Sequence, residues 1–408
     1  MLVLLISIIT FETVFGWFLD FLDKKEAKKQ LPIEITDIYT DQERQLSHNY
    51  HEDHEKVGFI SDSLSYFGIL FLLLLGYLGK FYEYLGLYFQ HSIGQALAFF
   101  GVIFIVSDLL SLPFAYYSTF VIEEKYGFNK TNLQTFILDK LKSYLLTALI
   151  GGTVLFILLY LVENLGQNFW IYFWVVAVGI MLFFNAFYAT LILPIFNKLS
   201  PLPDSELKNN IVALSKKLDF PLSEIFLLDG STRSTKANAF FSGIGKTKKI
   251  VLYDTLLEKN TNDEILAILA HEVGHYKKNH IYKTFFLAIF EMGLLLYLTS
   301  WLIFNPELSL VLGANSWHIP LNLWAIGVLF SPLSTILGIF SSYLSRKHEF
   351  EADHFAKQAV GNSEHLVSAL KKLTSLHLVN PTPHPLTVFL SYSHPTLAER
   401  IRALQKNY

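Results

Sequence analysis

The stretch His271-Glu272-Val273-Gly274-His275 has the H-E-x-x-H spacing of a zinc hydrolase and stands just before a long apolar run. On a helix, positions four residues apart lie on one face, so the His271 and His275 imidazoles can reach the same Zn²⁺. Glu272 is then placed to act as a general base on water at the metal. The stretch predicts a helix that carries a metal site next to a membrane.

The residues before this stretch predict the helix that the spacing requires. Thr261 and Glu264 have the positions of a capping box, and apolar residues follow at helical spacing. Gly274 costs about 1 kcal/mol relative to alanine inside a helix. Its presence indicates that substrate or a neighbouring helix approaches closely there.

A third metal ligand is available in the charged stretch 346–356, directly after another apolar run. Glu349 and Asp353 are four residues apart and share one helix face. Glu349 can therefore complete a site of two histidines and one glutamate, while Asp353 accepts a hydrogen bond from a ligand imidazole. These ligands, together with Glu272, support the hypothesis of a metalloprotease.

Other polar residues of this charged stretch point away from the predicted ligand face. Glu351 is two residues from Glu349, so we interpret it as a solvated or structural carboxylate. His348 and His354 are also off this face and are not expected to bind the metal.

The composition is typical of a polytopic membrane protein, since 52% of the 408 residues are hydrophobic, 16% are charged and 36 are phenylalanine. A membrane-spanning helix needs about 20 apolar residues. Seven runs approach or exceed this length, and they cover approximately residues 2–19, 66–90, 94–119, 144–163, 169–194, 282–304 and 323–344. The predicted fold class is an all-α membrane protein of seven spans with a small α+β cytoplasmic segment.

Lysine and arginine are distributed unevenly among the loops. All but two of the 32 follow the first, third, fifth or seventh span, and the opposite loops, near 91–93, 164–168 and 305–322, contain none. Because positive residues favour the cytoplasmic side, the N-terminus is expected to face outward. Both stretches with expected metal ligands then face the cytoplasm.

Four simpler features limit the alternatives. The run 2–19 lacks the basic start and the cleavage site of a signal peptide, so we expect an uncleaved first span. The absence of cysteine means that any zinc is held by histidine and carboxylate. The net charge of -3 does not suggest nucleic acid as a partner. Residues 21–63 are rich in charge and are expected to form a solvated loop containing at most a short helix.

Residues 200–281 are expected to form a small folded segment. The pattern predicts an amphipathic helix over 205–218, a strand over 225–228 and a second strand over 249–253, before the zinc helix. The intervening residues 236–243 are either an edge strand that holds an extended substrate beside the metal or one arm of a plain hairpin. The sequence leaves both interpretations open.

Five stretches of the chain occur together, in the same order, in one known family. They are EEKYGFNK at 123–130, NAF at 238–240, HEVGH at 271–275, SRKHEFEADHFA at 345–356 and SHPTLAERI at 393–401. With seven expected spans besides, nearly the whole chain resembles the type I CAAX prenyl endopeptidases, which are integral-membrane zinc metalloproteases.

The resemblance implies a seven-helix barrel around a large water-filled chamber, with the zinc site near the cytoplasmic end. It implies one Zn²⁺ per chain, with His271, His275 and Glu349 as ligands and Glu272 as the base. The substrate in this family is a C-terminal tripeptide that follows a prenylated cysteine. The expected partners are therefore a peptide or protein substrate and the lipid bilayer.

The resemblance also assigns roles to three residues that the sequence alone does not single out. Asn238 would bind the substrate backbone. His394 and Arg400 would stabilise the tetrahedral intermediate and the site around it. Without the family, His394 has the pattern of a solvated loop histidine.

Several polar residues lie inside or at the ends of the expected spans. Charges at membrane depth usually face the bundle interior or water, so these residues are expected to line the chamber rather than to be catalytic. The alternative is packing within the bundle or, at a span end, a side chain that reaches out to water. They are Glu12, Lys80, Asp108, Asn185 and Glu291.

The expected organisation has four parts. Residues 1–199 hold five spans with cytoplasmic loops, 200–281 the protease segment, 282–344 two further spans, and 345–408 a cytoplasmic tail with the third ligand. A bacterial inner membrane is favoured over an endoplasmic reticulum, because the chain is of moderate length and its loops are compact.

Three other functions remain open from the sequence. One is a protease of broad specificity that clears misfolded membrane proteins, as the related HtpX-type proteases do. The second is a zinc-bound membrane protein that does not cleave, for which Glu272→Gln would change nothing. The third is a transporter, whose flux would survive the loss of zinc.

Overall fold

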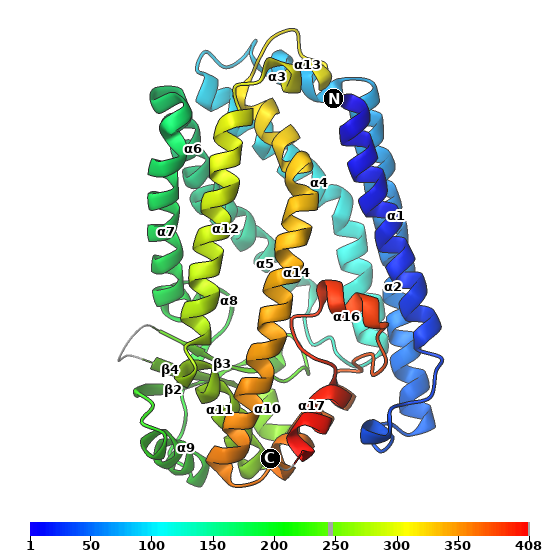
Figure 1. Ribbon diagram of the computed structural model, residues 1–408, viewed down its shortest axis with the longest axis vertical. Helices are drawn as coiled ribbons and strands as arrows, with labels where there is room; N and C mark the ends of the chain where they lie inside the picture. Colours follow the sequence, from blue (N-terminus) through cyan, green and yellow to red (C-terminus); the bar gives the residue numbers. More distant parts are fainter. Residues whose placement is uncertain (244–247, 407–408) are drawn as a thin grey trace.

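Long helices stand side by side as a ring, and a small sheet with shorter helices lies at one end of it (Figure 1). The structure is a computed structural model and describes residues 1–243 and 248–406. The predicted fold class, an all-α polytopic membrane protein with a small α+β segment, is confirmed.

Helices long and apolar enough to cross a membrane make up most of the ring. In the described residues they are Leu2–Glu26, Asp41–Leu74, Ser92–Glu123, Leu133–Phe196, His280–Leu302 and Ile319–Val360. Only 6 to 11% of the residues in their apolar windows are buried within the protein, so most of this surface is left for lipid or for the interior of the ring.

The longest of these apolar stretches changes direction once. Helix α6 (Gly152–Leu165) ends at Gly166, whose φ is 54°, and α7 (Phe169–Phe187) begins after one 3₁₀ turn and packs back against α6. Positive φ is readily adopted by glycine, which explains the turn at this residue. The number of seven spans stays a prediction, because the structure contains no membrane.

The prediction of a solvated loop over residues 21–63 is wrong. Helix α1 (Leu2–Glu26) continues beyond the expected span, and after a 3₁₀ turn, η1 (Ile33–Ile35), α2 (Asp41–Leu74) begins inside the supposed loop. A capping box at Thr40 starts α2, and Tyr50 is buried on its charged half. The charged composition therefore belongs to the polar end of a long helix.

The end of the ring opposite the sheet is closed by α3 (Tyr77–Leu85) and α13 (Pro306–Val311) (Figure 1). Gly76 and Gly313 both have positive φ, and a β-carbon on Gly313 would lie 2.3 Å from the carbonyl oxygen of Gly76. Only glycine permits this backbone approach. The expected span 66–90 is consequently broken at Gly76.

The remaining membrane helices include three π-helical turns. They are α4 (Ser92–Tyr117), η2 (Ser118–Glu123), α5 (Leu133–Leu146), η3 (Thr147–Gly151), η5 (Tyr188–Ile192), α8 (Leu193–Phe196), α12 (His280–Leu302) and α14 (Ile319–Val360). Helix α14 runs unbroken from its apolar half into the charged stretch 346–356. The expected boundary between residues 344 and 345 falls inside this helix.

The sheet has the strand order β1-β2-β4-β3 and contains the predicted strands. Its strands are β1 (Leu199–Pro201), β2 (Leu222–Leu228), β3 (Ala239–Ser242) and β4 (Lys248–Tyr253). Strand β2 pairs parallel with β4, and the other pairs are antiparallel. Strand β3 is thus an edge strand as well as one arm of an antiparallel pair, so both interpretations of 236–243 are compatible with it.

The remaining helices are short. They are α9 (Glu206–Lys217), η6 (Gly230–Thr232), α10 (Asp254–Lys259), α11 (Asn262–Lys277), α15 (Glu364–Leu376), α16 (Pro385–Ser391) and α17 (Leu397–Gln405). Of these, α9, α10 and α11 contact the sheet, whereas α16 packs against α14 and α1. Ile211 of α9, Ile250 and Leu252 of β4 and Leu269 of α11 are buried in one core between sheet and helices. This core fixes α11 relative to the edge strand.

Most of the polar residues that were predicted inside the spans have local partners. Asp108 forms an ion pair with Lys140 at 2.7 Å, and Glu291 accepts a hydrogen bond from Ser341. Lys80 donates to a backbone carbonyl in the closed end, which fits the alternative of a residue at a span end. Whether any of them lines a water-filled chamber stays a prediction.

Candidate metal centre

Helix α11 begins at the capping box that the sequence predicts. Thr261 Oγ1 accepts from the Glu264 backbone, and the Glu264 carboxylate accepts from the Thr261 backbone at 2.9 Å. Glu264 is buried and also binds Ser368 and Lys372 of α15, at 2.6 and 2.7 Å. The start of the helix that carries both histidines is therefore fixed to its neighbour.

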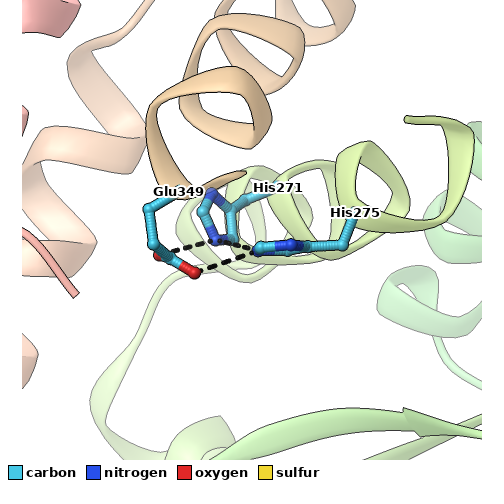
Figure 2. A group of neighbouring side chains, drawn as sticks. All are labelled: His271, His275 and Glu349. Atoms are coloured by element: carbon cyan, nitrogen blue, oxygen red, sulfur yellow. Dashed lines mark hydrogen bonds and ion pairs between the residues drawn. The ribbon is translucent and has the colours of Figure 1, made fainter. Parts of the chain in front are cut away.

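Three side chains converge where α11 meets α14 (Figure 2). The Nε2 atoms of His271 and His275 are 3.1 Å apart, and the Glu349 carboxylate oxygens lie 3.2 Å from His275 Nε2 and 3.4 Å from His271 Nε2. Ligand atoms around a tetrahedral Zn²⁺ are separated by about 3.3 Å. The spacing of the three donors matches that coordination.

The electrostatics of this cluster favour a cation. Glu349 Oε2 is buried and has no hydrogen-bond partner among the described residues. Burial lowers the pKa of His271, but the Asp353 and Glu349 carboxylates outweigh it and raise the pKa to about 9. The cluster thus stabilises a positive charge at neutral pH, and a divalent metal ion would meet the same requirement. Two imidazoles and one carboxylate fit a zinc site.

Glu272 lies beside the two histidines, and its carboxylate is not engaged by another side chain in the described part of the chain. It forms no hydrogen bond or ion pair within residues 1–243 and 248–406. Burial raises the pKa of Glu272, although the neighbouring histidines oppose the shift. A carboxylate with a raised pKa can accept a proton from water and hold it for transfer, as a general base must.

Asp353 and Arg400 lie behind the ligands. The Nδ1 atom of His271 is 2.8 Å from Asp353 Oδ1, and Arg400 donates to both Asp353 oxygens at 2.8 and 2.6 Å. Arg400 Nη1 is also 3.3 Å from Glu349 Oε2. Because Arg400 is buried, its charge acts on the ligands and not on the open face of the site.

His394 occupies the open side of the cluster. Its side chain is 62% exposed, and its Nε2 is 3.5 Å from Glu349 Oε1. The Ser393 hydroxyl is 2.9 Å from His394 Nδ1 and orients the ring. The structure therefore brings a loop histidine, which the sequence alone would leave in solvent, next to the metal ligands.

Arg346 was not singled out from the sequence, yet it holds the segment that precedes His394. It donates to the carbonyls of Val388, Phe389 and Tyr392 at the end of α16. Arg346 is three residues before Glu349 on α14, so one helix carries both the third ligand and the support of the His394 segment. A basic residue before Glu349 was visible in the sequence, but its partners are about 40 residues away in the chain.

Asn238 lies at the start of the edge strand and is exposed. Its backbone carbonyl accepts from Tyr253, and its side-chain oxygen accepts from Ala239. Strand β3 contacts α11, so the strand and the metal cluster are on adjoining elements. No direct contact joins Asn238 to the metal ligands in the part of the chain that the structure describes.

Comparisons with known families cover nearly the whole chain. Residues 22–198 match the family described as CAAX prenyl protease N-terminal, five membrane helices, and residues 201–408 match peptidase family M48.

Named relatives have similar lengths. The chain is 36% identical over 329 residues to CAAX prenyl protease 1 of Saccharomyces cerevisiae, covering 77% of this chain and 72% of that one. It is 34% identical to the Homo sapiens homologue, with 92% and 88% covered, and 34% identical to that of Oryza sativa, with 96% and 94% covered. These relatives are eukaryotic, so the expected bacterial inner membrane receives no support.

A crystal structure of S. mikatae Ste24p has the same fold. It superimposes with a TM-score of 0.93 and 32% sequence identity, covering 99% of this chain and 98% of that one. The likeness includes the ring of long helices and the segment with the metal cluster.

Proposed function

Since the chain belongs to peptidase family M48 and carries the CAAX prenyl protease N-terminal region, we propose that its substrate is a C-terminal CAAX peptide with a prenylated cysteine. The chain is an integral, multi-pass membrane metalloprotease that acts on peptide or protein substrates. The observation that carries the metal-dependent cleavage is the convergence of two imidazoles and a buried carboxylate at one point. The proposed substrate class is supported by the similarity to CAAX prenyl proteases over nearly the whole chain.

The metal that we propose is one Zn²⁺ per chain, held by His271, His275 and Glu349. The ligand distances and the absence of cysteine support zinc over thiolate-bound metals. When bound, zinc supplies Lewis-acid polarisation of the scissile carbonyl and lowers the pKa of water.

We assign the proton transfers to Glu272. Its carboxylate takes a proton from the attacking water and passes the proton to the leaving amine. The open position of His394 suits it to donate a hydrogen bond to the oxyanion that develops on the carbonyl. Asp353 holds the proton of His271 on Nδ1, and Arg400 keeps Asp353 and Glu349 in place.

Asn238 and the free edge of β3 are the proposed binding place for the substrate backbone. An extended peptide can add to an edge strand through main-chain hydrogen bonds. The contact between β3 and α11, the helix that carries both histidines, supports this placement. The uneven distribution of lysine and arginine, nearly all of which fall on one side of the expected spans, supports a cytoplasmic position for the cluster.

The test is cleavage of a fluorogenic farnesylated CAAX peptide by the detergent-purified protein, beside the same peptide without the lipid. We expect cleavage to require the prenyl group, to stop with a zinc chelator, and to fall about 10²-fold or more in Glu272→Gln with metal content unchanged. The matched control is Glu258→Gln, an exposed carboxylate on α10.

Equal cleavage of both peptides, still dependent on Glu272, would favour the broad-specificity protease instead. Failure of the metal-loaded protein to cleave either peptide would contradict the proposed substrate class.

A further inference from the structure

Two further histidines, His280 and His348, lie behind the proposed metal ligand His275. The Nδ1 atom of His275 is 3.1 Å from Nδ1 of His280, and His280 Nε2 is 3.0 Å from Glu351 Oε2. The His280 ring is buried and stacks on His348, with ring centroids 3.9 Å apart and an interplanar angle of 10°. His280, His348 and Glu351 have no role in the proposed mechanism.

The turn between α11 and α12 produces this arrangement. Helix α11 ends at Lys277, and Asn279 has φ of 57°, a left-handed conformation that asparagine tolerates better than most residues. The chain reverses there, so His280 at the start of α12 faces back toward His275. Glu351 reaches the same point from α14.

For an ionised Glu351 and a neutral His280, only one placement of the imidazole protons satisfies the hydrogen bonds that join Glu351, His280 and His275. An ionised carboxylate only accepts, so His280 Nε2 must carry the proton that Glu351 receives. The other nitrogen of a neutral His280, Nδ1, is then an acceptor and receives the Nδ1 proton of His275. The Nε2 lone pair of His275 is consequently directed to the metal cluster.

We propose that His280 and Glu351 are positioning residues that fix the tautomer and ring orientation of His275 as a metal ligand. This inference rests on the proposed function, because it presumes a metal at His271, His275 and Glu349. His271 has its own partner in Asp353, so each ligand imidazole is oriented by a different carboxylate, one directly and one through a histidine.

Glu351 and Glu349 are two residues apart on α14, and both are linked to His275. Glu349 lies next to the Nε2 atom of His275, whereas Glu351 is linked to the Nδ1 atom through His280. The contact chain therefore joins α11, α12 and α14 at the metal. Glu351, which the sequence pattern indicates to be a solvated or structural carboxylate, is the hydrogen-bond partner of the buried His280.

The test compares metal retention in His280→Phe, which keeps the stacked ring but removes both nitrogens, and in Glu351→Ala. The purified, zinc-loaded proteins are mixed with a chromophoric chelator, and the affinity and rate of zinc loss are measured. Loss of such a partner typically weakens metal binding about 10- to 100-fold, which is the expected result. In Co²⁺-loaded samples we expect a changed visible spectrum, since the His275 ring is no longer held.

Conservative and control variants separate positioning from folding. Glu351→Gln should lie between wild type and Glu351→Ala, because its amide oxygen still accepts from His280. The Glu351 side chain is 34% exposed, so Glu351→Ala decides the question if His280→Phe does not fold. Glu364→Ala, an exposed residue in the first turn of α15, should retain metal like wild type.

Two outcomes would overturn the inference in distinguishable ways. If Glu351→Ala holds zinc as tightly as wild type and its Co²⁺ spectrum is unchanged, His280 and Glu351 do not position His275, and the proposed function stands. If the wild-type protein itself does not bind one metal ion per chain, the proposed function fails and the inference fails with it.

Discussion

The backbone of Ala352 packs tightly against Gly274. A β-carbon on residue 274 would lie 3.1 Å from both the Cα and the carbonyl oxygen of Ala352. Gly274 stands next to His275 on α11, and Ala352 lies one turn from Glu349 on α14. This contact limits how closely the histidines and the third ligand approach, and it shows that a neighbouring helix comes close to Gly274, one of the two alternatives that the sequence predicts.

Substitution of Gly274 should weaken metal binding more than folding. Gly274→Ala gains about 1 kcal/mol of helix propensity, which offsets part of an overpacking cost of about 1 to 3 kcal/mol. Separation of the two backbones moves Glu349 away from the histidines, so zinc affinity should fall, and fall further in Gly274→Val. Chelator competition and thermal unfolding measure the two effects. The control is Gly58→Ala, where a β-carbon meets no atom within 4 Å; equal zinc affinity in all variants would refute this account.

Asp353→Asn should lower both metal affinity and stability. His271 loses a charged partner, which typically costs about 10- to 100-fold in metal affinity. Buried Arg400 loses its bidentate partner, and a broken buried pair costs about 3 to 5 kcal/mol. Asp37→Asn is the matched control, because the Asp37 pair with Lys371 is at the surface and should contribute little. A thermal unfolding curve like that of wild type would argue against the Asp353 prediction.

His394→Ala should reduce kcat without releasing the metal. Loss of one oxyanion donor costs about 10²- to 10³-fold in kcat. The exposed position of His394 means that its removal leaves no cavity, so zinc content and unfolding temperature should stay as in wild type. Steady-state kinetics on the farnesylated peptide give kcat and KM separately. An effect confined to KM would assign His394 to substrate binding instead.

Arg346→Gln should act through His394. Without the guanidinium, the carbonyls at the end of α16 lose their donors and the segment leading to His394 is less restrained. We expect a lower kcat, and the double variant Arg346→Gln/His394→Ala should be no slower than His394→Ala alone. Arg402→Gln, in an exposed pair with Glu34, is the control. Additive losses in the double variant would show that Arg346 acts independently.

His377 should make stability depend on pH between about 4 and 6.5. Burial, together with the nearby positive charges of Lys236 and Lys259, lowers the pKa of His377 to about 4. The neutral ring accepts a hydrogen bond from the Ala237 backbone, next to Asn238. The native state thus binds fewer protons than the unfolded chain, whose histidine pKa is about 6.5.

Stability should consequently be unaffected by His377 above this window and should fall as the pH falls through it. In His377→Gln, the amide can accept the same hydrogen bond at every pH, so the decrease in unfolding temperature between pH 6.5 and 4 should be smaller. Parallel pH profiles for the two proteins would exclude His377 as the cause.

The sequence was sufficient wherever a local repeat sets the structure. The four-residue spacing of His271 and His275, the capping box at Thr261 and the apolar runs each follow from helix geometry over a few turns. The charged residues 41–63 were misinterpreted because hydropathy records where a helix leaves the membrane and not where the helix ends. That distinction depends on packing against other parts of the fold, such as the burial of Tyr50 against Ile122 and Phe128.

The sequence by itself determined the fold class, the residue types of the metal cluster and the helix faces that carry them, because these depend on periodicity along the chain. Only the tertiary structure decided which helices meet and which polar groups surround the ligands. Gly274 against Ala352, Arg400 on Asp353, and Glu351 behind His280 join residues that are far apart in the sequence. An imidazole is oriented by the partner of its second nitrogen, and that partner is supplied by another helix.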